Sequence, residues 1–290
     1  GVTTNNLGGG LSAIWLDGLR KPVLDHSVPQ IGAPAAWQAG LDGSGVKVAV
    51  LDTGIDATHP DLAGQVVGQA NFTEGEEDDK DRYGHGTHVA STIAGTGAVS
   101  AGKYRGVAPG ADLLDGKVCG QRGCQDSWIL AGMQWAVQQG AAVVNLSLGA
   151  EDTPEVDPVE QAVQSLTEQH GTLFVVAAGN DGDDATINSP ASADAALAVG
   201  AVDRDDQLAG FSSRGPRTGD GGLKPDITAP GIDIVAANSA DGFLGEPGAA
   251  YATSSGTSMA TPHVVGAAAL LAQRHPEWTA AELKPALMAS

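Results

Sequence analysis

The chain has 290 residues, enough for one α/β domain with a large core, and 42% of them are hydrophobic. Its formal net charge of −20 argues against nucleic acid and anionic membranes as partners and suits a soluble secreted, extracellular protein. No apolar run reaches the roughly 18 residues of a membrane span.

Short apolar runs rich in β-branched residues alternate with helical stretches. The helical stretches cover residues 128–138 and 158–170. Buried strands are predicted over 46–51, 112–118, 141–146, 172–178 and 196–202. This alternation predicts an α/β fold with three layers, in which helices cover both faces of a mainly parallel, twisted sheet.

Asp52 directly follows the first predicted strand, in the string AVLDTGID. In open α/β sheets, chemistry gathers outside the carboxyl ends of the strands, so Asp52 is a candidate acid. A turn aspartate is one alternative. A phosphoryl-transferring aspartate is another, but it would require a downstream Lys and Mg²⁺ cluster that the sequence does not offer.

Two histidines stand in GHGTH, at the start of a helical pattern. One of His85 and His88 is then a general base, and the other is a packing or hydrogen-bonding neighbour. A zinc site is the alternative, but the further ligands of a zinc peptidase motif are missing.

Asn180 follows the run 172–178 in the string AAGND. Its amide can donate to an oxyanion and is uncharged at any working pH. An asparagine in a left-handed turn is the alternative.

Ser258 stands in GTSMATPH, before an apolar run that predicts a buried helix. Pro262 suits the first turn of that helix. Ser258 would therefore lie at a helix N-terminus, where free N–H groups favour a developing oxyanion. A simple N-cap serine is the alternative.

These four strings, in this order, resemble the subtilisin-like serine peptidases, the subtilase family, of the bacterial secreted type. Further matching stretches include THPDL at 58–62, GVAP at 106–109 and VNLSLG at 144–149. The resemblance runs from about residue 28 to residue 288. It implies that Asp52 is the acid, His85 and not His88 the base, and Ser258 the nucleophile. Asn180 and the Ser258 N–H would stabilise the oxyanion.

The resemblance also implies how substrate binds. An extended peptide would pair with an edge strand at Gly123, Cys124 and Gln125. The pocket for the residue before the scissile bond would have Asn188 at its base and small walls, which predicts a broad preference for bulky apolar residues. The walls are Ser147, Leu148, Gly149, Ala178 and Gly179.

Cys119 and Cys124 are the only cysteines in the chain. In a secreted protein such a close pair is expected to be bridged. Two separate thiols are the alternative. A redox-active pair is disfavoured because the spacing is not Cys-x-x-Cys.

The ends of the chain depart from the family pattern. Residues 1–26 are expected to be a prosegment remnant or an N-terminal extension, since residues 11–20 resemble the last strand of an inhibitory prosegment. Residues 27–290 would be the peptidase domain, truncated at its C-terminal end. The implied partners are protein and peptide substrates and the chain's own prosegment, acting as chaperone and inhibitor. A monomer is expected.

No cofactor is expected for catalysis, and metal ligands stay unassigned. The acidic run 73–81 is expected to be a solvated surface loop, with structural calcium left open. The loop 96–104 lacks the asparagines of a calcium site found in many subtilisins, which leaves Asp61 without its partners.

Two functions remain open. The first is a serine endopeptidase that works through an acyl-enzyme. The second is a catalytically silent binding protein with a subtilase fold. A silent relative usually loses its nucleophile, base or acid, and all three are present here, so the sequence favours the enzyme.

Overall fold

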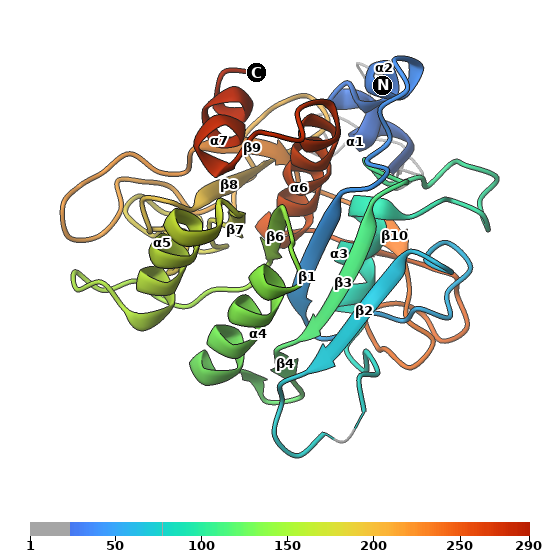
Figure 1. Cartoon of the computed structure of the whole chain (residues 1–290), viewed down its shortest axis with the longest axis horizontal. Coiled ribbons are helices and arrows are strands. Elements are labelled where there is room, and N and C mark those ends of the chain that lie inside the picture. Colours follow the sequence, from blue (N-terminus) through green and yellow to red (C-terminus); the bar gives the residue numbers. More distant parts are fainter. Residues whose placement is uncertain (1–23, 77) are drawn as a thin grey trace, which may run out of the picture.

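The computed structural model of the protein describes residues 24–76 and 78–290. A single parallel sheet runs through its centre, as Figure 1 shows. From one edge to the other, the strands are β2 (Val66–Asn71), β3 (Asp112–Lys117), β1 (Lys47–Asp52), β6 (Val143–Leu146), β7 (Leu173–Ala177), β8 (Leu197–Val202) and β9 (Ile227–Pro230).

Helices cover both faces of the sheet, as the sequence predicts. On one face α3 (His85–Ala94) and α6 (Thr257–Arg274) pack against each other and against the strands. The other face carries α4 (Asp126–Gln138) and α5 (Pro158–His170), which lie in front of the sheet in Figure 1. Three shorter helices flank α6: α1 (Leu24–Gln30), α2 (Ala33–Gln38) and α7 (Ala280–Met288).

The strands bury both of their faces, which explains why they are nearly continuous apolar runs. In β1, Val48 and Val50 join the core under α3 and α6. Ala49 and Leu51 point the other way and join the core under α4 and α5. This alternation divides the apolar interior into two layers, and their burial is the main stabilising term of the fold. The three-layer α/β prediction is confirmed.

All five predicted strands form, with ends that differ by one or two residues. The sequence did not indicate β2 or β9 at the sheet edges, nor two hairpins. β2 is only half buried and contains Gly68, and β9 ends in Pro230, so neither has a clear strand pattern. The hairpins are β4–β5 (Cys119–Gly120 with Gly123–Cys124) and β10–β11 (Ile234–Ala237 with Tyr251–Ser254).

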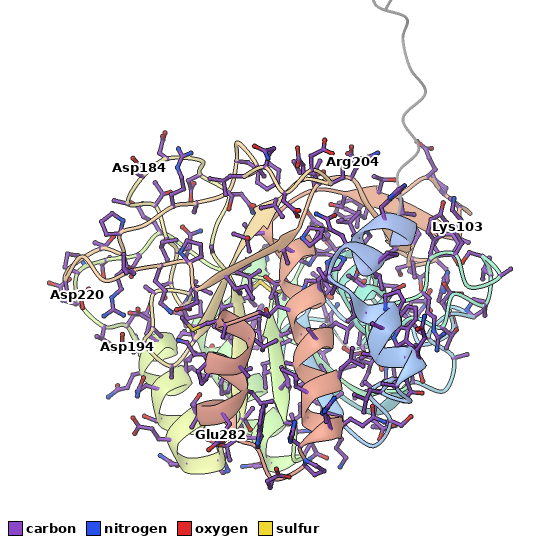
Figure 2. All side chains as sticks on the ribbon, turned by 90° about the horizontal axis from the view of Figure 1, so that it is seen from above. Lys103, Asp184, Asp194, Arg204, Asp220 and Glu282 are labelled. Carbon is purple, nitrogen blue, oxygen red and sulfur yellow. A yellow bond between two sulfur atoms is a disulfide. The ribbon has the colours of Figure 1, made fainter. Side chains whose placement is uncertain are left out.

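Several exposed acidic side chains lie on outer loops, as Figure 2 shows for Asp184, Asp194 and Asp220. Arg217 pairs with the last two at 2.6 and 2.5 Å. Exposed pairs of this kind contribute little to stability, so the charge acts mainly on solubility. No helix in the described part of the chain is long and apolar enough to cross a membrane.

Candidate active site

The four candidate residues gather at the carboxyl edge of three neighbouring strands. Asp52 is the last residue of β1, and Ser147 directly follows β6. Asn180 comes just after β7. Because β1, β6 and β7 are adjacent and parallel, their carboxyl ends share one edge, the expected place for chemistry in such a sheet. The N-termini of α3 and α6 add His85 and Ser258 to this edge.

Asp52 and His85 form a hydrogen-bonded pair. His85 Nδ1 lies 2.8 Å from Asp52 Oδ1, which also accepts a bond from the Thr53 N–H at 2.8 Å. Asp52 is 2% exposed, whereas the His85 side chain keeps 19% of its surface accessible. The carboxylate is therefore buried behind the imidazole. It fixes the tautomer in which Nδ1 carries the proton and Nε2, on the exposed side of the ring, can accept one.

Two glycines let the histidine loop approach β1. Gly84 has φ of 97°, in the left-handed region that glycine tolerates. A Cβ on Gly86 would lie 2.2 Å from the carbonyl oxygen of Gly54, closer than any side chain could pack. The two glycines of Gly-His-Gly thus allow the chain to turn into α3 directly against the loop after Asp52.

The pKa values of His85 and His88 are shifted in opposite directions. Burial lowers the pKa of His85, but the charge and hydrogen bond of Asp52 outweigh it, and the net pKa is raised. Burial lowers the pKa of His88 to about 4. His88 is fully buried, and its Nε2 is hydrogen-bonded with the carbonyl oxygen of Ile234 at 3.0 Å. His88 therefore stays neutral and structural, the neighbour role that the sequence assigned to one of the pair.

Ser258 is the second residue of α6, and a proline shapes its surroundings. Pro262 lies in the second turn, not the first as predicted from the sequence, so the Ser258 carbonyl loses its usual intrahelical N–H donor. Ser147 Oγ replaces that donor at 3.0 Å. In return, Ser258 Oγ donates to the Ser147 carbonyl oxygen at 3.1 Å. In the described part of the chain, no hydrogen bond joins Ser258 to His85.

The amide of Asn180 is oriented by the start of α6. Its Oδ1 accepts bonds from the Thr257 N–H at 2.8 Å and from Thr257 Oγ1 at 3.1 Å. With the oxygen held there, Nδ2 remains as a donor beside Gly256. The Ser258 N–H has no acceptor among residues 24–76 and 78–290, so the helix start leaves a second donor there.

Three of the predicted pocket residues, Gly149, Ala178 and Gly179, lie against Asn188. A Cβ on Gly179 would lie 2.8 Å from Asn188 Cγ, and one on Gly149 would lie 3.3 Å from Asn188 Cβ. The Asn188 N–H donates to the Ala178 carbonyl at 2.9 Å. Asn188 also lines an adjoining cavity of about 300 Å³ that contains the acidic side chains of Glu151, Asp152 and Asp181.

Cys119 and Cys124 form the expected disulfide. They face each other across the antiparallel hairpin β4–β5, with Cys119 buried and Cys124 exposed. The whole of Gly123–Gln125 is exposed, as an edge that binds another chain must be.

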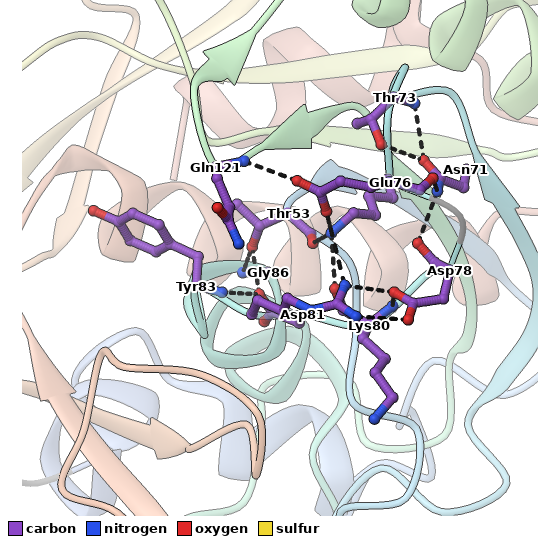
Figure 3. Close-up of polar contacts among 12 residues, drawn as sticks. Thr53, Asn71, Thr73, Glu76, Asp78, Lys80, Asp81, Tyr83, Gly86 and Gln121 are labelled. Atoms are coloured by element: carbon purple, nitrogen blue, oxygen red, sulfur yellow. Dashed lines mark hydrogen bonds and ion pairs between the residues drawn. The ribbon is translucent and has the colours of Figure 1, made fainter.

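The acidic run 73–81 was predicted to be solvated, and this is wrong at its end. Asp81 is only 1% exposed, and both its oxygens accept hydrogen bonds (Figure 3). Glu77 of the same run lies outside the described residues. Nothing in the sequence distinguishes the last acidic residue of the run from the others, so pattern reasoning missed it.

Lys117 is a second buried group that the sequence analysis missed. It ends β3 beside Asp52 and is only 2% exposed. Its Nζ donates to the carbonyl oxygens of Thr53 at 2.7 Å and Lys80 at 2.8 Å, and it pairs with Glu76 at 3.1 Å. Glu76 in turn accepts the Gln121 N–H of the disulfide hairpin (Figure 3). Three oxygens offset the cost of burying this ammonium group.

Asp61 is hydrogen-bonded to other groups of the protein. It is fully buried and accepts bonds from the Val99 N–H at 2.9 Å and the Tyr251 hydroxyl at 2.7 Å. Within the described ranges, no group of three or more His, Cys, Asp or Glu side chains is placed to hold a metal ion.

Comparison with known proteins decides what this arrangement is. The sequence profile of the subtilase family matches residues 43–290. The chain belongs to the subtilase family. It is a serine endopeptidase, a hydrolase with the Asp-His-Ser triad of that family, and such enzymes need no cofactor for catalysis.

Individual relatives support the same family assignment. Subtilisin Savinase of Lederbergia lenta is 46% identical over 258 residues, covering 89% of this chain and 87% of Savinase. Subtilisin E of Bacillus subtilis is 42% identical over 269 residues, covering 90% of this chain and 64% of its own length. A solved cold-adapted subtilisin-like serine proteinase is 34% identical with a TM-score of 0.72, covering 86% of this chain and 83% of its own.

The electrostatics of His85 give a prediction for pH. A base must be neutral, and the raised pKa keeps His85 protonated to a higher pH than an ordinary histidine. As the pH falls through that raised pKa, this subtilase should lose kcat/KM, so activity should be low at about pH 5 and high at about pH 8. A flat pH profile of kcat/KM for a peptide substrate would mean that His85 is not the base.

Proposed function

We propose that this subtilase cleaves peptide bonds with Ser258 as nucleophile, His85 as general base and Asp52 as the acid that stabilises the imidazolium. The observation that carries this proposal is the 2.8 Å bond between buried Asp52 and half-buried His85, at the strand edge where α6 presents Ser258. Ser258 Oγ attacks the carbonyl carbon while His85 takes its proton. The amine then leaves with that proton, and water hydrolyses the acyl-enzyme.

The nucleophile has to turn before it can react. Its hydroxyl donates to the Ser147 carbonyl in the structure, so the attack requires Oγ to release that acceptor and face His85 Nε2. Catalytic hydrogen bonds commonly tighten only when substrate is bound. The Ser258 carbonyl accepts the Ser147 Oγ hydrogen bond at 3.0 Å, which holds the backbone at Ser258 against the end of β6.

The developing oxyanion would be stabilised by Asn180 Nδ2 and the Ser258 N–H. Thr257 fixes the Asn180 amide from behind, which aims Nδ2 before substrate arrives. Because donors placed in advance need no reorganisation, we expect Asn180→Ala to lower kcat by about 10²–10³.

A fluorophosphonate tests this proposal against a catalytically silent binding protein. It should label the wild-type chain stoichiometrically at Ser258, and Ser258→Ala and His85→Ala should neither label nor cleave peptides. The matched control is Ser255→Ala. In the described part of the chain, the hydroxyl that it removes accepts only the Asp233 N–H at 2.8 Å, so this variant should label normally. A wild-type chain that stays unlabelled would point to the silent protein.

The substrate preference belongs to the same proposal. The glycines at 149 and 179 let Asn188 pack directly against both walls of the pocket. Small walls add little bulk and an uncharged base offers no ion pair, so bulky apolar or aromatic residues should dominate before the scissile bond. A peptide-library digest read by mass spectrometry measures this. A library dominated by Arg or Lys would contradict it, and would mean that long basic side chains reach Glu151, Asp152 or Asp181 in the adjoining cavity.

We also propose that the exposed edge Gly123–Gln125 pairs with the backbone of an extended substrate. The disulfide closes the hairpin directly beneath this edge, and so short a loop should stabilise the fold by only about 2 kcal/mol. Its main effect would then be on substrate binding.

Removal of the disulfide tests whether it acts mainly on substrate binding or on the stability of the fold. Cys119→Ser with Cys124→Ser should raise KM for long peptides several-fold and lower the melting temperature by only a few degrees. Hydrolysis of a minimal ester that does not reach residue 123 should barely change. Equal slowing of the ester and the long peptide would mean that the bridge supports the whole site and not the edge.

We also propose where this subtilase acts, its oligomeric state and the role of its N-terminal segment. A net charge of −20 and a disulfide suit a protein that acts outside the cell, as a monomer on protein substrates. Residues 1–26 are proposed as prosegment or extension, and residues 1–23 lie outside the described part. Ser27, the first proposed domain residue, is buried and hydrogen-bonded to His263 Nε2 at 2.8 Å, which supports placing it in the folded body.

A further inference from the structure

Asp81 is a buried carboxylate at the base of the catalytic loop, and it is not one of the triad residues. Its Oδ2 accepts bonds from the N–H of Thr87 at 2.9 Å and from the Thr87 hydroxyl at 2.7 Å. Its Oδ1 accepts from the Gly84 N–H at 2.7 Å and the Tyr83 N–H at 3.2 Å. These donors lie on both sides of His85, so one carboxylate holds the backbone before and after the base.

The same carboxylate reaches the loop of the acid through Thr53. Thr53 Oγ1 donates to Asp81 Oδ1 at 2.8 Å and accepts the Gly86 N–H at 2.9 Å (Figure 3). The Thr53 N–H donates to Asp52 Oδ1 at 2.8 Å. A continuous path of hydrogen bonds therefore runs from Asp81 through Thr53 to Asp52, beside the direct contact between Asp52 and His85.

The charge of Asp81 also acts on His85. Burial lowers the pKa of the imidazole, Asp52 raises it, and Asp81 adds a smaller contribution in the same direction. A buried charge is poorly screened by solvent, so its effect on a nearby imidazolium persists in salt. Several other ionisable groups surround this cluster. They include Asp52 on β1, Asp56 in the following loop, Asp79 before Asp81, Asp115 and Lys117 on β3, Tyr83 beside the base and His88 on α3.

We propose that Asp81 is a positioning residue for the peptidase reaction. Through Thr53 it sets the geometry between Asp52 and His85, and its charge stabilises the imidazolium that forms when Ser258 gives up its proton. This rests on the proposed roles of the triad. The competing explanation is that Asp81 only caps the N-terminus of α3, which would affect stability and leave the chemistry alone.

Three variants separate the two explanations, with every rate divided by the number of sites that a fluorophosphonate titrates. Asp81→Asn should lower kcat by about 10- to 100-fold, the loss expected for hydrogen bonds to a charged group, with KM within about twofold. It should also move the acid limb of kcat/KM to lower pH, because a lost negative charge lowers the pKa of His85. Thr53→Val should lower kcat with a smaller shift of that limb, and Thr53→Ser, which keeps the hydroxyl, should restore it.

Asp115→Asn is the matched control. Asp115 is another buried carboxyl nearby, and burial raises its pKa to about 8. It accepts bonds from the Ile55 N–H at 3.1 Å and Gln69 Nε2 at 3.2 Å, and within the described residues it makes no hydrogen bond to residues 81–88. We expect the Asp115→Asn variant to match the wild type in kcat and in the acid side of its pH profile of kcat/KM.

The other possible results of these experiments each decide the proposal. An unchanged kcat per titrated site with a lower melting temperature in Asp81→Asn would make Asp81 a helix cap and overturn the proposal. An equal loss in Asp115→Asn would also overturn it, as a general effect of disturbing the sheet edge. If Asp81→Asn does not fold, Thr53→Val against Thr53→Ser decides. A wild-type chain that is not labelled would refute the proposed triad itself, and so is distinguishable from these results.

Discussion

The site depends on one hydrogen bond between a strand end and a helix start. Asp52 ends β1, an interior strand of the sheet, and is only 2% exposed. His85 begins α3, which must approach that strand end closely for the bond to form. The constraint falls on Gly86, because any side chain there would collide with the carbonyl of Gly54. A buried carboxylate with a fixed donor is also far more effective electrostatically than the same pair in water.

A second constraint lies at the start of α6. A proline one turn after the nucleophile breaks the helical bond to the Ser258 carbonyl, and Ser147 at the end of β6 takes the place of the missing N–H. Backbone and side-chain bonds thus run in both directions between Ser147 and Ser258. Ser258, the proposed nucleophile, is in this way attached to the end of β6, the strand next to the one that carries Asp52.

Sequence patterns were sufficient for the strands of the sheet centre, and they pointed to the four candidate groups, although only the family resemblance chose His85 over His88. Buried strands are continuous apolar runs, and Asp52 and Asn180 stand where such runs end. The edge strands and hairpins escaped because they are short, half exposed or interrupted by glycine and proline. Asp81 escaped for another reason: an acidic run looks solvated in composition, and only the turn into α3 takes its last member inward. Lys117 lies at the end of a predicted strand, where the sequence gives no sign that carbonyl oxygens converge on its ammonium group.

The burial of Lys117 has a consequence for the chemical modification of lysines in this protein. Reagents that acylate amines act from solution, and they can approach Lys80, whose side chain is 52% exposed. They cannot approach Lys117, which is 2% exposed and enclosed by the carbonyls of Thr53 and Lys80 and the carboxylate of Glu76. Acylation at Lys117 can occur only when the loop before His85 separates from β3, so the extent of its modification reports how often the catalytic edge opens in an otherwise folded molecule.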